Sequence, residues 1–197
     1  HSLDRRQRQM CIRDRGLIDA GFAVKAYSEK ESIFRDTHES NFQNCALIGN
    51  GDILKTTDSE LLAYRGHIDL IFAGFPCQGF SNAGKKKAND PRNTLFKEFI
   101  RATKFIQPKY IIGENVKGLL GRKTVDDEMY IDVIQREFEN IGYRIKYRVF
   151  KVNKYNVPQK RERLIIIGTR LENKSLEFPE ESTDCLLYTS PSPRDRS

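Results

Sequence analysis

A series of short apolar runs, spaced along the middle of the chain, constrains the fold more than any other feature of the sequence. The runs are rich in β-branched and aromatic residues, and several are continuously apolar, which is typical of strands buried on both faces of a parallel sheet. They are Ala23 to Ser28, Cys45 to Gly49, Ile68 to Ala73, Tyr110 to Gly113, Tyr143 to Lys151 and Leu164 to Gly168.

Helical patterns separate most of these runs. Residues 93–106 and 127–141 each repeat their apolar side chains every three or four positions, as one face of an amphipathic helix does. Alternating strands and helices predict an α/β fold built on an open, mostly parallel sheet. The connection between the last two runs, residues 152–163, is too short for a crossover helix, so we expect an antiparallel pair at that edge of the sheet.

The composition limits the class of protein. The chain has 197 residues, 38% of them hydrophobic and 31% charged, and none of its apolar stretches approaches the length of a membrane span. Four cysteines lie far apart without a C-x-x-C spacing, which argues against a zinc cluster and against a disulfide framework. The arginine-rich start has no apolar segment of the secretory type. We therefore expect a cytoplasmic protein that binds no metal and has no membrane partner.

The two ends of the sequence differ from its middle. Residues 1–15 show neither helical nor strand periodicity, and residues 171–197 end, from 185 onward, in a tail rich in Ser, Pro and Arg. Both ends contain Arg-Asp-Arg and resemble translated sequencing-adapter sequence, and disordered tails are the alternative. We expect the folded domain to cover residues 16–170. Much of the net charge of +7 lies in the ends, so the remaining basic excess permits a nucleic-acid partner without establishing one.

Chemically reactive side chains lie next to three of the predicted strands. The segment 74–81, with Cys77, follows one strand, Glu114 follows the next, and Arg161 and Arg163 lead into the last. Ligands of open α/β sheets bind beyond the carboxyl ends of the strands. We therefore expect a thiol, a carboxyl group and a pair of guanidinium groups to face one cleft.

Each of these side chains also has an ordinary structural interpretation. A cysteine held between Gly and Pro is nucleophilic as a thiolate, but Cys77 taken alone fits a buried structural residue better. Burial would raise the pKa of Glu114 and let it hold a proton, whereas an ion pair is the alternative. Arg161 and Arg163 alternate and so point to one side, where they form either a fork for a carbonyl or phosphate group or a solvated basic stripe.

Four segments, taken together, resemble the DNA (cytosine-5) methyltransferase family. They are GFPCQGFS at 74–81, DPRNTLF at 90–96, ENVKGLL at 114–120 and NVPQKRERLIIIG at 156–168, in the order and at the spacing of the family. Weaker matches lie at 16–22, at Glu29 and at 51–53. The resemblance covers residues 16–170 and implies a Rossmann-like, S-adenosylmethionine-dependent methyltransferase sheet, mostly parallel with an antiparallel edge pair.

The resemblance also implies a mechanism. Cys77 would add covalently to C6 of a cytosine flipped out of the duplex, Glu114 would assist at N3, and C5 would then take a methyl group from S-adenosyl-L-methionine. Arg163 would hold the cytosine O2 atom, Arg161 would support the charged site, and Gln159 would order the loop.

Two further sets of residues take their expected roles from the resemblance. The expected cofactor contacts include two acids, Glu29 for the ribose hydroxyls and Asp52 for the adenine amino group. Either acid could instead cap a helix or lie at the surface. The expected cofactor contacts are Glu29, Asp52, Ile53, Phe75, Pro76, Leu95 and Asn115. The expected DNA contacts lie in or just before a lysine-rich loop over 81–92. The alternative interpretation of this segment is an ordinary solvated loop. The expected DNA contacts are Gln78, Ser81, Lys85, Lys86, Lys87 and Arg92.

The sequence departs from the family in three places. No glycine-rich cofactor loop precedes Gly16, Asn156 stands where glycine is common, and neither a target-recognition region nor a final helix follows the last strand. We therefore expect a fragment of a catalytic domain.

The resemblance implies a bacterial or phage restriction-modification methyltransferase in the cytoplasm of a bacterial cell or phage-infected host. We expect a monomer that acts on cytosine in double-stranded DNA, with a cognate restriction endonuclease as its genetic partner. A tRNA cytosine-5 methyltransferase and a truncated, catalytically inactive chain are the alternatives.

Overall fold

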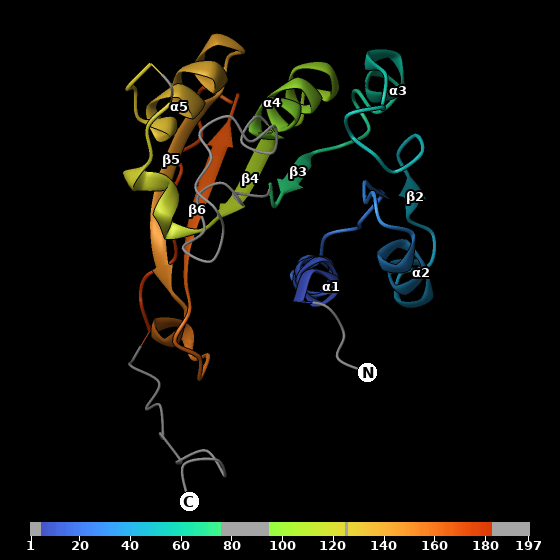
Figure 1. Cartoon of the computed structure of the whole chain (residues 1–197), viewed down its shortest axis with the longest axis horizontal. Coiled ribbons are helices and arrows are strands. Elements are labelled where there is room, and N and C mark those ends of the chain that lie inside the picture. The colour runs from blue at the N-terminus through green and yellow to red at the C-terminus, as the bar shows by residue number, and fades with distance from the viewer. Residues whose placement is uncertain (1–4, 76–94, 125, 183–197) are drawn as a thin grey trace, which may run out of the picture. The chain divides into compact units, whose positions relative to one another are not determined.

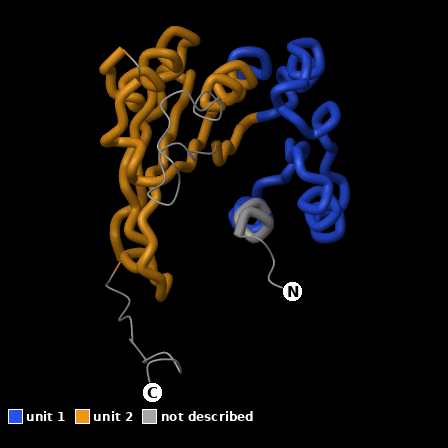
Figure 2. The backbone as a smooth tube through the Cα atoms, viewed as in Figure 1, with its two compact units in different colours: residues 1–68, 104–107 blue, residues 69–103, 108–197 orange. Residues whose placement is uncertain are grey.

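The computed structural model of the protein describes residues 5–75, 95–124 and 126–182, without the side chains of residues 5–10. The chain divides into two compact units, which Figure 2 shows in different colours. Unit 1 consists of residues 1–68 and 104–107, and unit 2 consists of residues 69–103 and 108–197. Each unit has a sheet of its own.

Unit 1 is built around two very short parallel strands, in which Ala26 pairs with Ala46 and Tyr27 with Leu47. Its core is small and consists of Tyr27 and Phe34, against which Cys45 and Leu47 pack. The elements of the unit are α1 (Arg5–Asp19), β1 (Ala26–Tyr27), α2 (Ser32–Asn41), β2 (Ala46–Leu47) and α3 (Asp58–Leu62).

Helix α1 differs from the sequence-based expectation. Residues 1–15 show no apolar periodicity, yet the helix begins at Arg5 and continues to Asp19. Arginine, glutamine, methionine and leucine are strong helix formers, so a helix forms here without an apolar stripe. Propensity outweighs periodicity in this segment.

Unit 2 holds the larger sheet, whose strand order is β3-β4-β6-β5 (Figure 1). Strands β3 and β4 are parallel, and β6 is antiparallel to both of its neighbours, so β3, β4 and β5 run in the same direction. The elements are β3 (Leu70–Ala73), α4 (Leu95–Ile106), β4 (Tyr110–Asn115), η3 (Lys117–Gly121), α5 (Tyr130–Asn140), β5 (Arg144–Lys151), η4 (Val152–Tyr155) and β6 (Glu162–Thr169), and the end of α4 from residue 104 belongs to unit 1.

The fold class predicted from the sequence is confirmed. Every predicted apolar run contains a strand, both predicted helices form, and β5 and β6 make the expected antiparallel pair with β5 at the edge. None of the described helices is both long enough and apolar enough to cross a membrane.

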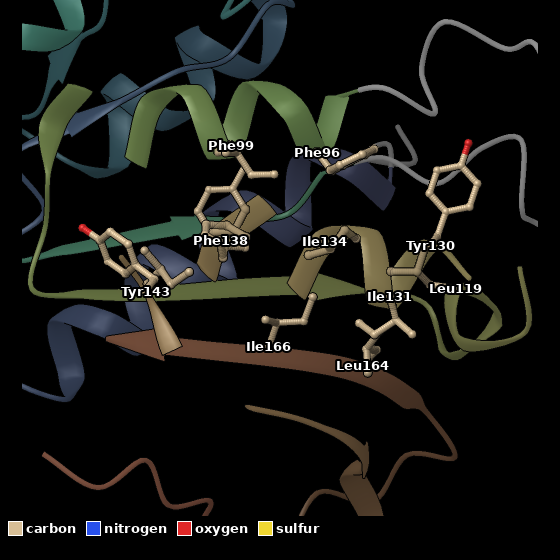
Figure 3. Packing of buried hydrophobic residues seen from close by; sticks show 12 residues of the cluster. Phe96, Phe99, Leu119, Tyr130, Ile131, Ile134, Phe138, Tyr143, Leu164 and Ile166 are labelled. Atoms are coloured by element: carbon tan, nitrogen blue, oxygen red, sulfur yellow. The ribbon is translucent and has the colours of Figure 1, made fainter. Parts of the chain in front are cut away.

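The core of unit 2 lies between the sheet and helices α4 and α5, as Figure 3 shows. The rings of Phe99 and Phe138 meet edge to face at 5.1 Å between centroids, and Ile166 of β6 is fully buried in the same cluster. Close packing requires glycine at position 168, because a Cβ atom there would lie 2.7 Å from Cγ1 of Ile111. The helices therefore cover the face of β4 and β6 that carries Ile111 and Ile166, and alternate residues point to the other face.

Candidate active site

The candidate active site lies at the carboxyl end of β4, where β6 begins. Glu114 is the penultimate residue of β4 and pairs in register with Ile165 of β6. Directly opposed residues of an antiparallel pair share one face of the sheet, and so do alternate residues along each strand. Arg161 and Arg163 therefore emerge on the same face as Glu114, opposite to the face that α4 and α5 cover.

Both arginines contact the same carboxylate oxygen. Nε of Arg163 donates to Oε1 of Glu114 at 2.9 Å, and Nη2 of Arg161 approaches that oxygen at 3.5 Å. The three side chains are largely shielded from water, with exposed fractions of 12% for Glu114, 24% for Arg163 and 33% for Arg161. Charge-assisted bonds in such a shielded place are stronger than the same bonds at the surface. The two guanidinium groups therefore lie on one side, as expected, and both contact the acid, while binding of a carbonyl or phosphate group stays a prediction.

The two arginines also influence each other. Burial lowers the pKa of the Arg161 guanidinium, the positive charge of Arg163 lowers it further, and Glu114 raises it in part. Two cations remain close together here because one carboxylate lies between them. The ion-pair interpretation of Glu114 is thus the one that the structure displays, and its proton-holding role stays a prediction.

Asn115 links this strand end to the segment that leads to Cys77. Its side chain is buried, and its Nδ2 atom donates to the backbone carbonyl of Phe75 at 3.3 Å. Its Oδ1 atom accepts the Val116 backbone N–H at 2.8 Å. The Asn115 amide therefore anchors the chain two residues before Cys77. A cofactor contact by Asn115 or Phe75 remains a prediction.

A second group of candidate residues lies at the ends of β1 and β2 in unit 1. Gly51 has φ of +90°, and a Cβ atom there would lie 2.4 Å from the backbone oxygen of Glu29. Only glycine permits this close approach of the two strand ends. The hydroxyl of Ser28 adds a bond to the Gly51 carbonyl at 2.9 Å, so the segments that carry Glu29 and Asp52 are tied together.

The two acids of this group also make local bonds. Oε1 of Glu29 accepts the backbone N–H of Glu31 at 3.0 Å, and Oδ1 of Asp52 accepts that of Leu54 at 3.2 Å. These bonds orient both carboxylates within the turns that follow the strands, and neither of them caps a helix. Ligand binding by Glu29 and Asp52 stays a prediction.

The remaining predicted residues are placed as follows. Ile53 lies half-buried in the turn after Asp52, and Leu95 is the half-buried first residue of α4. Gln159 is exposed, and its backbone carbonyl accepts the N–H of Arg161 at 3.0 Å. The other predicted residues lie outside the described ranges. They are Pro76, Cys77, Gln78, Ser81, Lys85, Lys86, Lys87 and Arg92.

Sequence reasoning missed one link between the two segments of the site. Nζ of Lys117 forms an ion pair with Oε2 of Glu162 at 3.2 Å, which joins the segment after Glu114 to the strand that carries both arginines. The available signal was an acid placed between the two arginines of the sequence, with a lysine shortly after Glu114. Within the described ranges, no group of three or more His, Cys, Asp or Glu side chains is arranged to hold a metal ion.

The sheet of unit 2 and its covering helices define an α/β domain, and comparison with known proteins specifies the family. The family model described as C-5 cytosine-specific DNA methylase matches residues 12–190. The chain belongs to this family. The match also extends beyond residues 16–170, the range that the sequence motifs covered.

Curated relatives agree with this assignment. The chain is 36% identical over 183 residues to the type II methyltransferase M.DdeI of Desulfomicrobium norvegicum, covering 89% of this chain and 44% of that protein. It is 40% identical over 180 residues to M.PspPI of a Psychrobacter species, covering 90% of this chain and 39% of that protein. The chain therefore spans less than half the length of these relatives.

Solved structures show the same fold. A DNA modification methyltransferase encoded within a prophage (E. coli) superposes with a TM-score of 0.60 at 29% identity, covering 76% of this chain and 41% of that one. DNMT2 of Spodoptera frugiperda gives a TM-score of 0.60 at 22% identity, over 84% of this chain and 48% of that one. The second likeness concerns the fold alone.

Proposed function

We propose that the protein to which this chain belongs methylates C5 of cytosine in double-stranded DNA, with S-adenosyl-L-methionine as the methyl donor. The observation that carries the proposal is the meeting of Glu114 with Arg161 and Arg163 at one carboxylate oxygen. Membership of the C-5 cytosine-specific DNA methylase family supports the same reaction.

The arrangement of acid and guanidinium suits one edge of a cytosine ring. N3 and O2 are neighbours on that edge, and both accept hydrogen bonds. A protonated Glu114 beside Arg163 would donate to N3 while the guanidinium donates to O2. These donors draw electrons from the ring and make C6 electrophilic. In the free protein Glu114 accepts a bond from Arg163, so the base would exchange this ion pair for contacts of both side chains with the ring.

Cys77 supplies the nucleophile in this proposal. Its thiolate would add to C6 and move electron density to C5. C5 would then take the methyl carbon as the bond from that carbon to the sulfonium sulfur of S-adenosyl-L-methionine breaks and S-adenosyl-L-homocysteine leaves. The C5 proton then leaves to a base, the bond between sulfur and C6 breaks, and 5-methylcytosine is released. The Asn115 bond to Phe75 holds the start of the Cys77 segment beside Glu114 and so supports this placement. The target base must leave the duplex, because C6 is inaccessible within the stack.

The described residues fit the adenosine end of the proposed cofactor. Gly51 lets the Asp52 segment approach Glu29, so two oriented carboxylates stand at neighbouring strand ends. Carboxylates in this position accept bonds from ribose hydroxyls and from an amino group. When bound, S-adenosyl-L-methionine supplies an electrophilic methyl group.

Double-stranded DNA is the proposed substrate, and tRNA is the weaker alternative. The relatives with the higher identities are named type II methyltransferases, which supports a role in restriction and modification in the bacterial cytoplasm beside a cognate endonuclease. We propose that the protein acts as a monomer.

A mechanism-based trap tests the proposal. The full-length protein is incubated with S-adenosyl-L-methionine and duplex DNA in which cytosines are replaced by 5-fluorocytosine, whose C5 fluorine blocks the final elimination. We expect a covalent adduct with the wild-type protein and none with Cys77→Ser. An adduct on fluorinated tRNA but not on DNA would move the assignment to tRNA. No adduct on either substrate would overturn the proposed activity.

A further inference from the structure

The outward face of the edge strand β5 carries a row of cations that the proposed chemistry does not use. Arg144, Lys146 and Arg148 alternate along the strand and therefore point to one side. A row of this kind usually marks a solvated or nucleic-acid-binding surface. Here these cations bind backbone carbonyls of residues 171–179, which follow β6 and belong to neither a helix nor a strand. We call residues 171–182 the strap.

Arg144 holds the beginning of the strap. Its Nη2 atom lies within hydrogen-bonding distance of the carbonyl oxygens of Leu171 at 2.6 Å, Glu172 at 3.0 Å and Lys174 at 3.1 Å. A guanidinium group surrounded by several carbonyl oxygens replaces the water that an extended backbone would otherwise need. The first turn of the strap is therefore fixed to the start of β5.

The next two cations hold the middle of the strap in the same order along the chain. Nζ of Lys146 donates to the Leu176 carbonyl at 3.0 Å, and Nη1 of Arg148 donates to that of Pro179 at 3.4 Å. Residue numbers thus increase together along β5 and along the strap. The strap runs in the direction of β5, and Figure 1 shows it returning beside the strand toward the turn that joins β5 to β6.

Phe178 is the apolar anchor of the strap. Its ring lies 5.0 Å from the guanidinium carbon of Arg148 and packs edge to face on Phe150 at 5.5 Å between centroids. The hydroxyl of Tyr155 also reaches the Pro179 carbonyl at 3.5 Å. Cation–π contact and aromatic packing are each worth roughly 0.5–1.5 kcal/mol at partly exposed sites, so Phe178 adds an apolar attachment to the polar bonds of the strap.

The strap ends on the connection that leads to the candidate active site. The backbone N–H and the hydroxyl of Ser182 both donate to the Lys154 carbonyl, each at 2.9 Å. Lys154 lies in η4, which begins at Val152, and the Val152 N–H bonds to the Arg161 carbonyl at 3.0 Å. The strap therefore bonds to the β5 side of the turn between β5 and β6, and the Val152–Arg161 bond joins that side to the one that carries Arg161.

Phe150 connects the strap to the arginine that contacts Glu114. Phe150 and Arg163 are direct partners in the β5–β6 register, so their side chains lie side by side on one face. Phe178 packs on one of these neighbours, and Glu114 binds the other. A continuous set of contacts thus runs from the strap to the carboxylate.

We propose that the strap positions Arg163 for the target base and that Phe178 and Arg148 are positioning residues that act through Phe150. The proposal deepens the proposed function. It rests on that function only where it assigns Arg163 a role toward cytosine. The positioning itself is a property of the free protein. It can be measured without DNA or cofactor, so its failure is distinguishable from failure of the proposed reaction.

The test follows the Nε–H proton of Arg163 by nuclear magnetic resonance, assigned by its loss in Arg163→Lys. In the wild-type chain the bond to Glu114 retards exchange of this proton with water. We expect Phe178→Ala to accelerate the exchange about tenfold, which is about 1.4 kcal/mol of lost protection. Phe178→Tyr should restore the rate to within about twofold, because a second aromatic ring fills the same place. Exchange in α5 should not change in any variant.

A control variant and a second readout keep the test decisive. Glu177→Ala is the control, because Glu177 is the neighbour of Phe178 and its carboxylate bonds to Ser175 within the strap. This change should leave the exchange rate of the Arg163 Nε–H proton unaltered. Release of the strap is measured as the rate of tryptic cleavage after Lys174, with Arg148→Ala/Phe178→Ala as the stronger variant. The positioning role would be overturned if trypsin showed that the strap is released while the exchange rate of the Arg163 Nε–H proton stayed unchanged. Failure of even the double variant to release the strap would overturn the assignment of these anchors.

Discussion

Arg163 donates its Nε–H to Oε1 of Glu114 at 2.9 Å, although the two residues are 49 positions apart in the chain. Arg161 adds a second positive charge at the same oxygen. Glu114 is the shared partner of the group, because its loss leaves two shielded guanidinium groups without a counter-charge, whereas loss of one arginine leaves the carboxylate with the other. The predictions below test this group and the packing that holds it in place.

Glu114→Gln should destabilise the protein as well as abolish methyl transfer. The change keeps the shape of the side chain but leaves Arg161 and Arg163 facing each other without the carboxylate. We expect the free energy of unfolding to fall by about 2 kcal/mol, below the usual cost of breaking a fully buried pair because the arginines are partly exposed. Urea denaturation measures the change. Asp127→Asn removes the exposed partner of Lys123 and should cost less than about 0.5 kcal/mol. Equal costs for the two changes would contradict this account.

Asn115→Asp should slow the formation of the Cys77 adduct. The two side chains have nearly the same shape, but aspartate cannot donate to the Phe75 carbonyl, and a carboxylate against that carbonyl is repulsive. We expect a loss of stability of about 1–3 kcal/mol and a trapping rate at least tenfold lower. Trapping at the wild-type rate would show that this anchor does not place the nucleophile.

Gly168→Ala should destabilise unit 2 through a steric overlap. The added Cβ would lie 2.7 Å from Ile111 Cγ1 and 2.9 Å from Ile145 Cγ2, and both atoms belong to packed side chains of the sheet. We expect a cost of about 1–3 kcal/mol, measured by thermal or urea unfolding. Gly121→Ala is the matched control, because no atom lies within 4 Å of its added Cβ. In the double variant with Ile111→Ala, the cost of Gly168→Ala should shrink.

Stability should fall between about pH 9 and pH 11 through the Cys45 thiol. Burial first, and the charge of Asp14 second, raise the pKa of Cys45 from 9.0 to about 11. In this window the unfolded chain loses the thiol proton while the folded chain keeps it, so rising pH favours unfolding, and the effect levels off above the folded pKa. Cys45→Ala should flatten this part of the stability profile. An unchanged slope in the variant would assign the loss to other groups.

Cys77→Ser should abolish turnover in the full-length protein while leaving its folding intact. A serine hydroxyl is far less ionised than a thiol at neutral pH and adds poorly to C6. Methyl transfer is measured with radiolabelled S-adenosyl-L-methionine, and unfolding is measured by denaturant titration. Methyl transfer by the variant at nearly the wild-type rate would refute the nucleophile assignment.

Local patterns in the sequence predicted much of the fold. The apolar runs over 68–73 and 110–113 became the parallel pair β3 and β4. Burial on both faces was the wrong part of this prediction, because buried and half-buried residues alternate along β4. The short connection before Arg163 required an antiparallel partner, and β5 and β6 supply it. Alternation along a strand placed both arginines on one side. These predictions succeeded because apolar periodicity and the length of a connection depend only on residues that are close together in the sequence.

The sequence could not predict which partners these side chains would find. An acid that follows an apolar run is compatible with a held proton and with an ion pair, and only the β4–β6 register brings Arg163 to Glu114. The row that begins at Arg144 resembles a basic surface, and only the return of the strap along β5 turns it into a set of carbonyl ligands. Helix α1 escaped notice because it forms without an apolar stripe.

The amino-acid sequence by itself therefore determined the strands, helices α4 and α5, the family and the identity of the reactive groups, since each of these depends on neighbouring residues or on motifs. The tertiary structure alone decided that Glu114 is paired with two guanidinium groups and that Phe178 rests on Phe150 beside Arg163. The physical reason is that electrostatic and packing energies depend on distances in space, and strand register sets these distances for residues far apart in the chain.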